Sequence, residues 1–450
     1  MKLNHIIFIF LIFMFIGCKI GKQYESPEIN MPDTYQSNLS DTSTVADIDW
    51  WEVYNDSLLV KYINLAIENN QDLKIAISRV EEYRSLKRIS ESDLLPSISI
   101  SGEREHEVSS GSINETDNEL VAELSWELDL WGRLRWQRDA GIADYMATAE
   151  DKNAVYQSLI ANVATTYFEL MAAKRELDII QQTAVSREEG VKIAELRYKG
   201  GLTSETPLQQ AEVELAKTLT LVPEVKYTIR KKNNLLSTLM GQFPENTLIS
   251  TYLLEHKLPD SVLVGIPSDL LSRRPDVRKA EQEVISANAK VGMAFTNMFP
   301  RISLSAEYGY ESEALSDLFS SPYNYLYGQL LSPIFNAGAN RARHKAAKAV
   351  LEQKALTYDK VVLKSFEETS NALGNVHRAK SVRNSLIKLE ESSRTYLKLA
   401  NLQHINGVVS YIDVLDAQRL LFDAEIRLNN AIRDEKISYV NLYKSLGGGW

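Results

Sequence analysis

Acidic side chains are the residues whose types and spacing in this sequence could do chemistry. Asp413 and Asp416 are three residues apart, which places both carboxylates on one face of a helix. Two carboxylates on one face can bind a cation. The alternative is that both acids stabilise the start of a helix through its dipole, by about 0.3–1 kcal/mol each.

No arrangement typical of an enzyme accompanies these acids. The sequence contains no Ser/His/Asp set, P-loop or glycine-rich nucleotide fingerprint. Its six histidines are scattered without a helical i, i+4 pair, and one cysteine cannot form an intrachain disulfide or a Cys-based zinc site. The net charge is −10 without a dense Lys/Arg run, which argues against nucleic acid as a partner. We therefore expect no enzyme, no metal site and no bound cofactor.

The N-terminus predicts export and a lipid anchor. An apolar run over 6–16 is too short for a permanent membrane helix and is typical of a secretory signal. It ends in Phe-Ile-Gly-Cys18, which resembles a bacterial lipobox, and Cys18 is the only cysteine. We expect a signal peptide over 1–17, a covalent diacylglycerol and N-acyl lipid on Cys18, and a lipidated tether over 18–49. A plain signal peptide with an incidental cysteine is the alternative. Lys19 is not an acidic retention signal and favours the outer membrane.

The chain contains one long internal duplication. Gly132 pairs with Gly338 and Gly201 with Gly407, each pair 206 residues apart. Repeats of about 20–50 residues would indicate a solenoid, so this period instead indicates one large unit that is duplicated and packed against itself. We divide the chain after the tether into repeat 1, an equatorial linker and repeat 2, at residues 50–241, 242–265 and 266–450.

The sequence of each repeat predicts the same order of secondary-structure elements. Two extended segments lead to a very long helix, a glycine turn and a return helix. The expected strands are about 96–107, 119–130, 300–311 and 323–335. The expected helices are 133–199 and 338–404, with return helices 205–241 and 411–446. Apolar residues at seven-residue intervals from Tyr156 to Tyr198 form an a/d seam, and a helix of 67 residues spans about 100 Å.

The extended segments have one apolar and one polar face. Leu120, Leu124 and Leu128 alternate with Glu123 and Glu127, and the lengths are near the ~9–11 residues of a membrane-spanning strand. A soluble β-hairpin is the alternative. Eight acids fall on or near the polar faces, and we expect them to line a cation-favouring pore, unless they are solvated rim residues. They are Glu103, Glu105, Glu107, Glu123, Glu127, Asp129, Glu307 and Glu311.

Tryptophans and glycines mark two further features. Trp126, Trp131 and Trp136 cluster where strand gives way to long helix, which is typical of an interfacial aromatic girdle. At the helix reversals, three glycines can take the positive φ that such turns need, and two serines can cap the return helices. These turn residues are Gly200, Gly201, Ser204, Gly407 and Ser410.

The number of strands predicts an oligomer. Four strands cannot close a barrel alone, an open sheet edge cannot face lipid, and known closed barrels start near eight strands. Two copies would supply eight strands and three copies twelve. The helices favour three copies, because each chain offers two full-length rods and two stacks of a return helix on a shorter helix (about 72–93 or 276–297). A homotrimer then has twelve rods around a hollow cylinder.

An ordered set of motifs links the chain to a known family. The motifs are Leu128-Asp-Leu-Trp-Gly-Arg133, Tyr198-Lys-Gly-Gly-Leu-Thr-Ser204, Ile266-Pro-Ser-Asp-Leu-Leu-Ser-Arg-Arg-Pro-Asp-Val-Arg278, Val414-Leu-Asp-Ala417 and Leu446-Gly-Gly-Gly-Trp450. Together, over about residues 50–450, they resemble the TolC-type outer-membrane factors, on the NodT/OprM-like lipoprotein branch. The resemblance implies an α+β membrane protein in which a trimeric 12-stranded β-barrel, four strands per chain, is continuous with a long periplasmic α-helical barrel.

The function that the resemblance implies is the outer-membrane exit duct of a tripartite efflux pump. An inner-membrane transporter of the RND class would supply energy, and a periplasmic adaptor would dock on the helical tips. The duct would be lipid-anchored in the cell outer membrane and extend into the periplasm. Alternatives are the outer-membrane component of type I protein secretion, a stand-alone porin and a periplasmic scaffold. Structural capping without docking is the alternative for the tip residues.

The resemblance also implies a periplasmic gate. Asp413 and Asp416 match the paired aspartates that line the entrance of TolC-like ducts, so three copies would form two stacked acidic rings that bind a divalent or hexamine cation. The polar latch of TolC is not implied, because three of its residues are replaced here, by His404, Val409 and Pro207.

Overall fold

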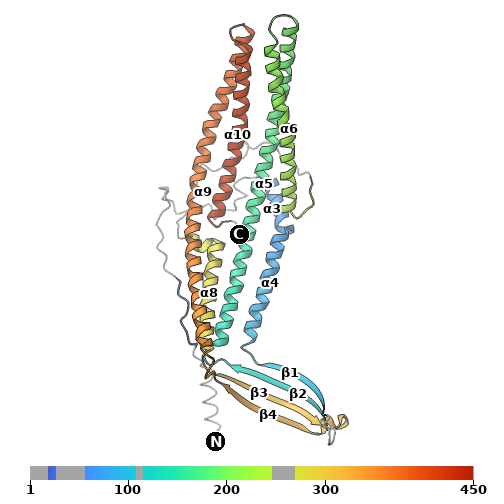
Figure 1. Cartoon of the computed structure of the whole chain (residues 1–450), viewed down its shortest axis with the longest axis vertical. Helices are drawn as coiled ribbons and strands as arrows, with labels where there is room; N and C mark the ends of the chain where they lie inside the picture. Colours follow the sequence, from blue (N-terminus) through green and yellow to red (C-terminus); the bar gives the residue numbers. More distant parts are fainter. Residues whose placement is uncertain (1–18, 27–55, 108–114, 246–268, 449–450) are drawn as a thin grey trace. The chain divides into compact units, whose positions relative to one another are not determined.

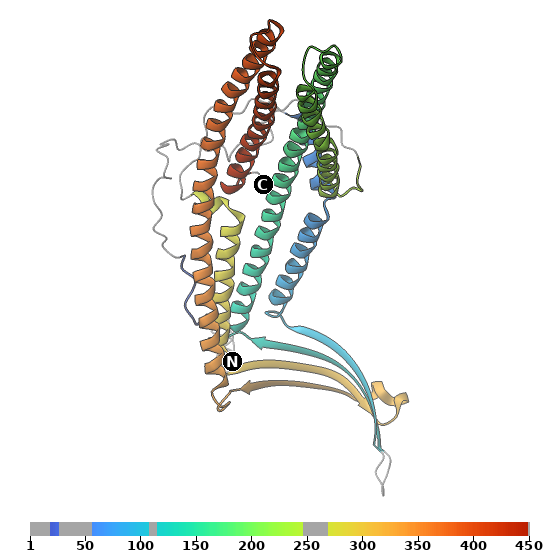
Figure 2. The same cartoon turned by 45° about the horizontal axis from the view of Figure 1, so that its top comes forward.

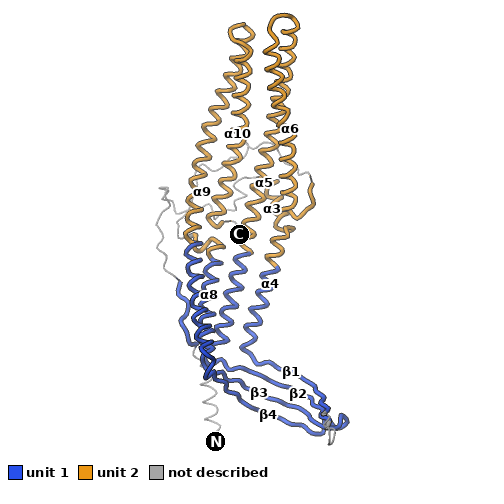
Figure 3. Tube along the Cα trace, viewed as in Figure 1, with its two compact units in different colours: residues 1–29, 78–151, 278–361 blue, residues 30–77, 152–277, 362–450 orange. Residues whose placement is uncertain are grey.

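The computed structural model describes residues 19–26, 56–107, 115–245 and 269–448. The expected signal peptide, Cys18 and most of the expected tether and linker lie outside the described residues. The chain forms two compact units (Figure 3): unit 1 comprises 1–29, 78–151 and 278–361, and unit 2 comprises 30–77, 152–277 and 362–450. Each unit takes segments from both sequence repeats, because the longest helices contribute to both units.

Unit 1 contains one antiparallel sheet in the order β1-β2-β3-β4 (Figure 1). The strands are β1 Ser97–Glu107, β2 Glu115–Leu128, β3 Arg301–Ser312 and β4 Pro322–Leu331, and Figure 2 shows their common curvature. Ile100 pairs with Ala122 and Ala122 with Tyr308, so the apolar sides of three strands share one face of the sheet. The expected alternation into an apolar and a polar face is confirmed for β1 to β3. In β4, Tyr325 pairs with Glu307, so the tyrosines of this strand lie on the polar face.

Two strands differ from their expected bounds. β2 begins at Glu115, ahead of its apolar pattern, because Glu115–Asn118 continue the ladder with β1. β4 ends at Leu331 rather than near 335, since Pro333 has no backbone N–H to donate to a ladder.

The helices follow the predicted rods closely. α5 (Arg133–Lys199) and α9 (Ala339–Ile405) have 67 residues each. The return helices are α6 (Thr206–Leu239) and α10 (Tyr411–Ser445). The shorter helices are α3 (Ser57–Asn69), α4 (Gln71–Ser92), α7 (Asp269–Arg273) and α8 (Pro275–Thr296), and a 3₁₀ turn, η3 (Leu315–Ser320), connects β3 to β4. Over the described parts of the chain, no helix is both long and apolar enough to cross a membrane.

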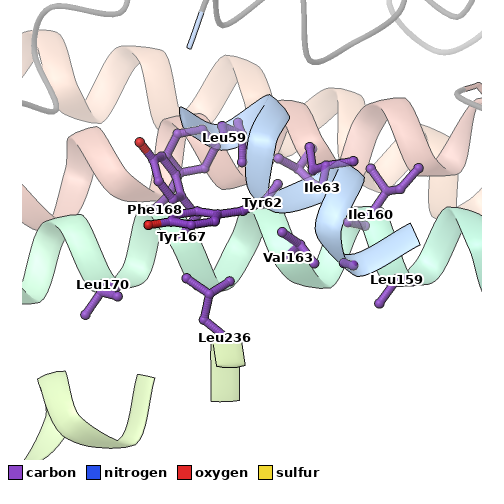
Figure 4. Close-up of a cluster of buried hydrophobic side chains, with 14 of the residues drawn as sticks. Leu59, Tyr62, Ile63, Leu159, Ile160, Val163, Tyr167, Phe168, Leu170 and Leu236 are labelled. Carbon is purple, nitrogen blue, oxygen red and sulfur yellow. The ribbon is translucent and has the colours of Figure 1, made fainter. Parts of the chain in front are cut away.

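The largest apolar cluster of unit 2 packs α3 against the middle of α5 (Figure 4). Leu59 and Ile63 of α3 lie with Val163 and Phe168 of α5, and all four are at most 2% exposed. Asp56 caps α3 by accepting hydrogen bonds from the amides of the next turn. The a/d seam of α5 is therefore buried where α3 covers it.

The duplication is visible in the backbone. Gly132 and Gly338 both have φ 82°, and Gly201 and Gly407 have φ 71° and 72°. These are left-handed conformations that favour glycine. Residues 206 positions apart therefore perform the same turn in both repeats.

Candidate functional site

In unit 2, the α5–α6 and α9–α10 connections are two glycine turns of the same type. At the α5–α6 tip, the Gly201 amide donates to the Tyr198 carbonyl and the Leu202 amide to the Arg197 carbonyl, both at 2.9 Å. These are the two hydrogen bonds of a Schellman motif with glycine at its left-handed position. Gly407 occupies the same place at the α9–α10 tip. Gly200 does not take a positive φ; its amide still bonds within α5.

The capping prediction is correct for Ser410 and wrong for Ser204. Ser410 is the N-cap of α10. The N-cap of α6 is Glu205, because the helix begins at Thr206 with Pro207 in its first turn, where a missing N–H costs nothing.

A cavity of about 420 Å³ lies between the two tips. Its lining includes Arg197 and Ser204 from one hairpin and His404, Ser410 and Tyr411 from the other. An Arg197 guanidinium N–H donates to His404 Nε2 at 2.6 Å, and His404 Nδ1 lies 3.2 Å from the Val409 carbonyl. This pair requires a neutral imidazole with its proton on Nδ1. His404 therefore joins the two hairpins.

Asp413 and Asp416 lie in the first turns of α10 but have different partners. Asp413 Oδ2 accepts from the Ser410 amide at 2.9 Å and from its hydroxyl at 2.8 Å, as in a capping box. The Asp416 side chain is 59% exposed, and Arg419 Nη1 lies 3.7 Å from its Oδ1. Asp416 is the more available of the two for a cation. Leu415 is 2% exposed, so it packs inside its own chain.

Near these acids, a buried ionic cluster joins α5, α6 and α10. Glu214 of α6 is 4% exposed. Its carboxylate lies 3.1 Å from Lys217 Nζ, 3.2 Å from Arg419 Nε and 3.4 Å from Arg187 Nη1. Arg187 also donates to the Glu214 carbonyl at 2.8 Å and to Thr218 Oγ1 at 2.5 Å.

The positive charges around Glu214 outweigh the effect of burial on its pKa. Burial alone would raise the pKa of Glu214, but the Lys217 hydrogen bond and the charges of Arg419 and Arg187 hold that pKa below its usual value. Sequence reasoning missed this cluster. A signal was present, because Glu214 falls between Ala211 and Thr218 on the buried stripe of α6.

Acids on the polar face of the sheet form cross-strand rows. Glu103 pairs with Glu119 and Glu119 with Glu311, while Glu123 pairs with Glu307. Like charges directly opposite each other destabilise a sheet, so this row is costly to the fold. Glu119, the middle member, is not among the eight acids expected from the sequence; its carboxylate accepts a hydrogen bond from Tyr323. Glu105 lies on the same face, and the side chain of Glu107 lies outside the described residues.

Two of the eight expected pore acids have structural partners at the base of the sheet. Glu127 forms a bidentate pair with Arg133 at 2.9 and 2.8 Å. Asp129 follows β2 rather than lying in it, and binds the Leu134 and Arg135 amides and the Arg135 guanidinium at 3.0 Å. Both acids stabilise the start of α5. Across the residues with assigned positions, no group of three His, Cys, Asp or Glu side chains could hold a metal ion.

The girdle prediction is wrong for Trp136. Trp136 is 3% exposed, because Gly292 of α8 leaves room for the indole and residues 19–21 cover it. Trp131 is only partly buried; it stacks on Phe299 and donates to the Pro300 carbonyl at 2.7 Å.

Known proteins resemble the chain over nearly its whole length. Residues 62–242 and 266–448 match the family described as outer membrane efflux protein. The solvent efflux pump outer membrane protein SrpC of Pseudomonas putida is 32% identical over 460 residues, which cover 98% of this chain and 97% of SrpC. The probable outer membrane lipoprotein SilC of Salmonella typhimurium is 28% identical, with the same coverage. The open state of the MtrE outer membrane channel of Neisseria gonorrhoeae matches with a TM-score of 0.86 at 28% identity, covering 96% of this chain and 98% of that chain.

Proposed function

Because the chain belongs to the outer membrane efflux protein family, we propose that it is the exit duct of a tripartite efflux pump. The observation that carries this function is the four-stranded sheet, in which β1 to β3 have one apolar and one acidic face. Such a sheet can turn its apolar face to lipid and its acids to water. The duct is a passive conduit, and its residues bind and guide rather than catalyse.

The working form is a homotrimer. β1 and β4 each have one unpaired edge in the four-stranded sheet, and edges exposed to lipid leave backbone groups unsatisfied. Pairing β4 of one copy with β1 of the next, three times, closes twelve strands.

The proposed partners are a periplasmic adaptor and an inner-membrane transporter of the RND class. The two Schellman tips give the adaptor a rigid surface, and the cavity with Arg197 and His404 offers polar contacts at its centre. The name of SrpC places that relative in a solvent efflux pump, which supports a pump partnership for this chain.

Asp416 is the proposed gate residue, assisted by Asp413. In a trimer the exposed Asp416 carboxylates form a ring that attracts cations. Arg419 ties each Asp416 to the cluster around Glu214, so the gate is connected to the α5–α6 hairpin of the same chain.

The anchor is a lipid on Cys18 at the outer membrane. The lipobox-like sequence supports this assignment, and so does the relative SilC, which is named a probable outer membrane lipoprotein. Mass spectrometry of the mature protein should find acyl chains on Cys18. An unmodified mature Cys18 would contradict the assignment.

Deletion and complementation test the function directly. Deleting the gene should increase accumulation of a fluorescent efflux dye, and the wild-type gene should restore export. A Gly407→Pro variant that still forms trimers should not restore it. Normal dye export in the deletion strain, with other duct genes also removed, would argue against an efflux role.

A further inference from the structure

We propose that the residues directly after Cys18 occupy a built receptor site on α5 and α8, which fixes where the lipid anchor leaves the folded protein. The N-terminal strap is defined as residues 19–26, and all of its partners lie in unit 1. The role in anchoring rests on the lipidation of Cys18 proposed above, whereas the docking of the strap does not.

Backbone hydrogen bonds hold the start of the strap. The Ile20 amide donates to the Trp131 carbonyl at 3.1 Å, and Trp136 Nε1 donates to the Ile20 carbonyl at 2.8 Å. Further along, Asn288 Nδ2 donates to the Lys22 carbonyl at 3.2 Å. The strap is thus bound through main-chain groups by both α5 and α8.

The Lys19 side chain adds a charged contact. Its ammonium pairs with Asp139 and lies 3.4 Å from the centre of a Trp136 ring, close enough for a cation–π interaction. Burial alone would raise the pKa of Asp139, but the hydrogen bonds from Lys19 and Arg138 hold that pKa below its usual value. The first residue after the proposed lipid is therefore held by two independent attractions.

Three glycines make room for this arrangement. A Cβ on Gly292 would lie 2.4 Å from the Trp136 indole, and one on Gly21 would lie 3.0 Å from it. A Cβ on Gly132 would lie 2.8 Å from Lys19 Cγ and 2.9 Å from its Cα. The site is shaped to accept the strap closely.

The internal duplication supplies a matched control. Gly338 has the same φ of 82° as Gly132, yet a Cβ there would meet nothing within 4 Å among the described residues. At the positions 206 residues after Trp136 and Asp139, the second repeat has Ala342 and Lys345. Within the described residues, the receptor site is therefore specific to the first repeat.

Trypsin can report the docking, because no Lys or Arg occurs between Lys22 and Lys61. Full-length protein labelled with radioactive palmitate is extracted in detergent, its trimers are isolated, and brief trypsin treatment follows. Cleavage after Lys19 or Lys22 separates the label from the large fragment. The N-terminal residue of that fragment is also read by mass spectrometry, which works without any label.

The docked strap should protect these bonds in wild-type trimers. Gly132→Ala should speed cleavage about tenfold, since cleavage follows the population of the open strap, and Gly338→Ala should cleave like wild type. Asp139→Asn, which leaves both trypsin sites intact, should also cleave faster. Equal cleavage rates in the wild type and all three variants would refute the proposed receptor site. Equal acceleration of cleavage by Gly132→Ala and Gly338→Ala would refute it as well. If no protein carries the palmitate label, the strap has no role in lipid anchoring. The masses of the large fragments would still show whether the strap is docked.

Discussion

Glu214→Gln tests the ionic cluster that connects the proposed gate residue Asp416 to the α5–α6 hairpin of the same chain. The substitution keeps the shape of the side chain and removes its charge. Arg187, with a side chain 5% exposed, would then lack its carboxylate partner. Breaking a buried ion pair from one side costs about 3–5 kcal/mol. We expect the lower end, about 3 kcal/mol, because Arg187 keeps the Glu214 carbonyl and Thr218 as acceptors.

The effect on gating should be smaller than the effect on stability. Arg419 is 43% exposed, and exposed ion pairs contribute about 1 kcal/mol or less. Because we expect the Arg419–Glu214 contact to hold the closed gate, its loss should raise the open-to-closed ratio of purified channels by up to about fivefold. Single-channel recording in planar bilayers measures this ratio, and thermal melting of detergent-solubilised trimers measures the stability.

Glu212→Gln is the matched control, since Glu212 is an exposed glutamate on the same helix. It should change neither quantity. If Glu214→Gln melts like Glu212→Gln, the buried cluster does not stabilise unit 2. If Glu214→Gln melts earlier but opens no more often, the link from Arg419 to the gate is wrong.

Four further outcomes are expected. Asp413→Asn/Asp416→Asn channels should lose block by a hexamine cation from the periplasmic side, and unchanged block would refute the gate. Gly407→Pro should abolish adaptor cross-linking in intact trimers, because proline cannot take the φ of 72° found there; normal cross-linking would place docking elsewhere. Glu119→Gln should reduce cation preference in reversal-potential measurements, and an anion-selective wild-type channel would exclude an acidic pore. Burial lowers the pKa of Lys436 to about 8, so between pH 8 and 10 the unfolded chain binds more protons and stability should rise with pH; Lys436→Met should lack this rise in melting temperature.

Elements with strong local signals were predictable from the sequence. The apolar residues at seven-residue intervals predict the α5 helix through their periodicity alone. Gly201 and Gly407 predict the two turns because glycine readily takes a positive φ. β4 ends at Leu331, short of the expected residue 335. Apolar residues continue in the sequence at Ile334 and Phe335, but Pro333 has no N–H to donate to a ladder. Ser204 was misplaced as a cap because Pro207 shifts the start of α6 by one residue.

Contacts between distant segments were not predictable from local patterns. Trp136 resembles an interfacial tryptophan in sequence, and only its packing against Gly292 and residues 19–21 shows that it is buried. The cluster around Glu214 unites residues from three helices, with Arg187 and Arg419 far apart in the chain. Such pairs depend on the tertiary arrangement rather than on spacing.

Native mass spectrometry of the protein extracted from the outer-membrane fraction tests the trimeric duct most directly. We expect one species containing three chains, each beginning at Cys18 and carrying the mass of its acyl groups. With three copies, pairing β4 of each copy with β1 of the next leaves no unpaired edge in a twelve-stranded barrel. A protein recovered as single chains or dimers, or recovered with the inner membrane, would contradict the account.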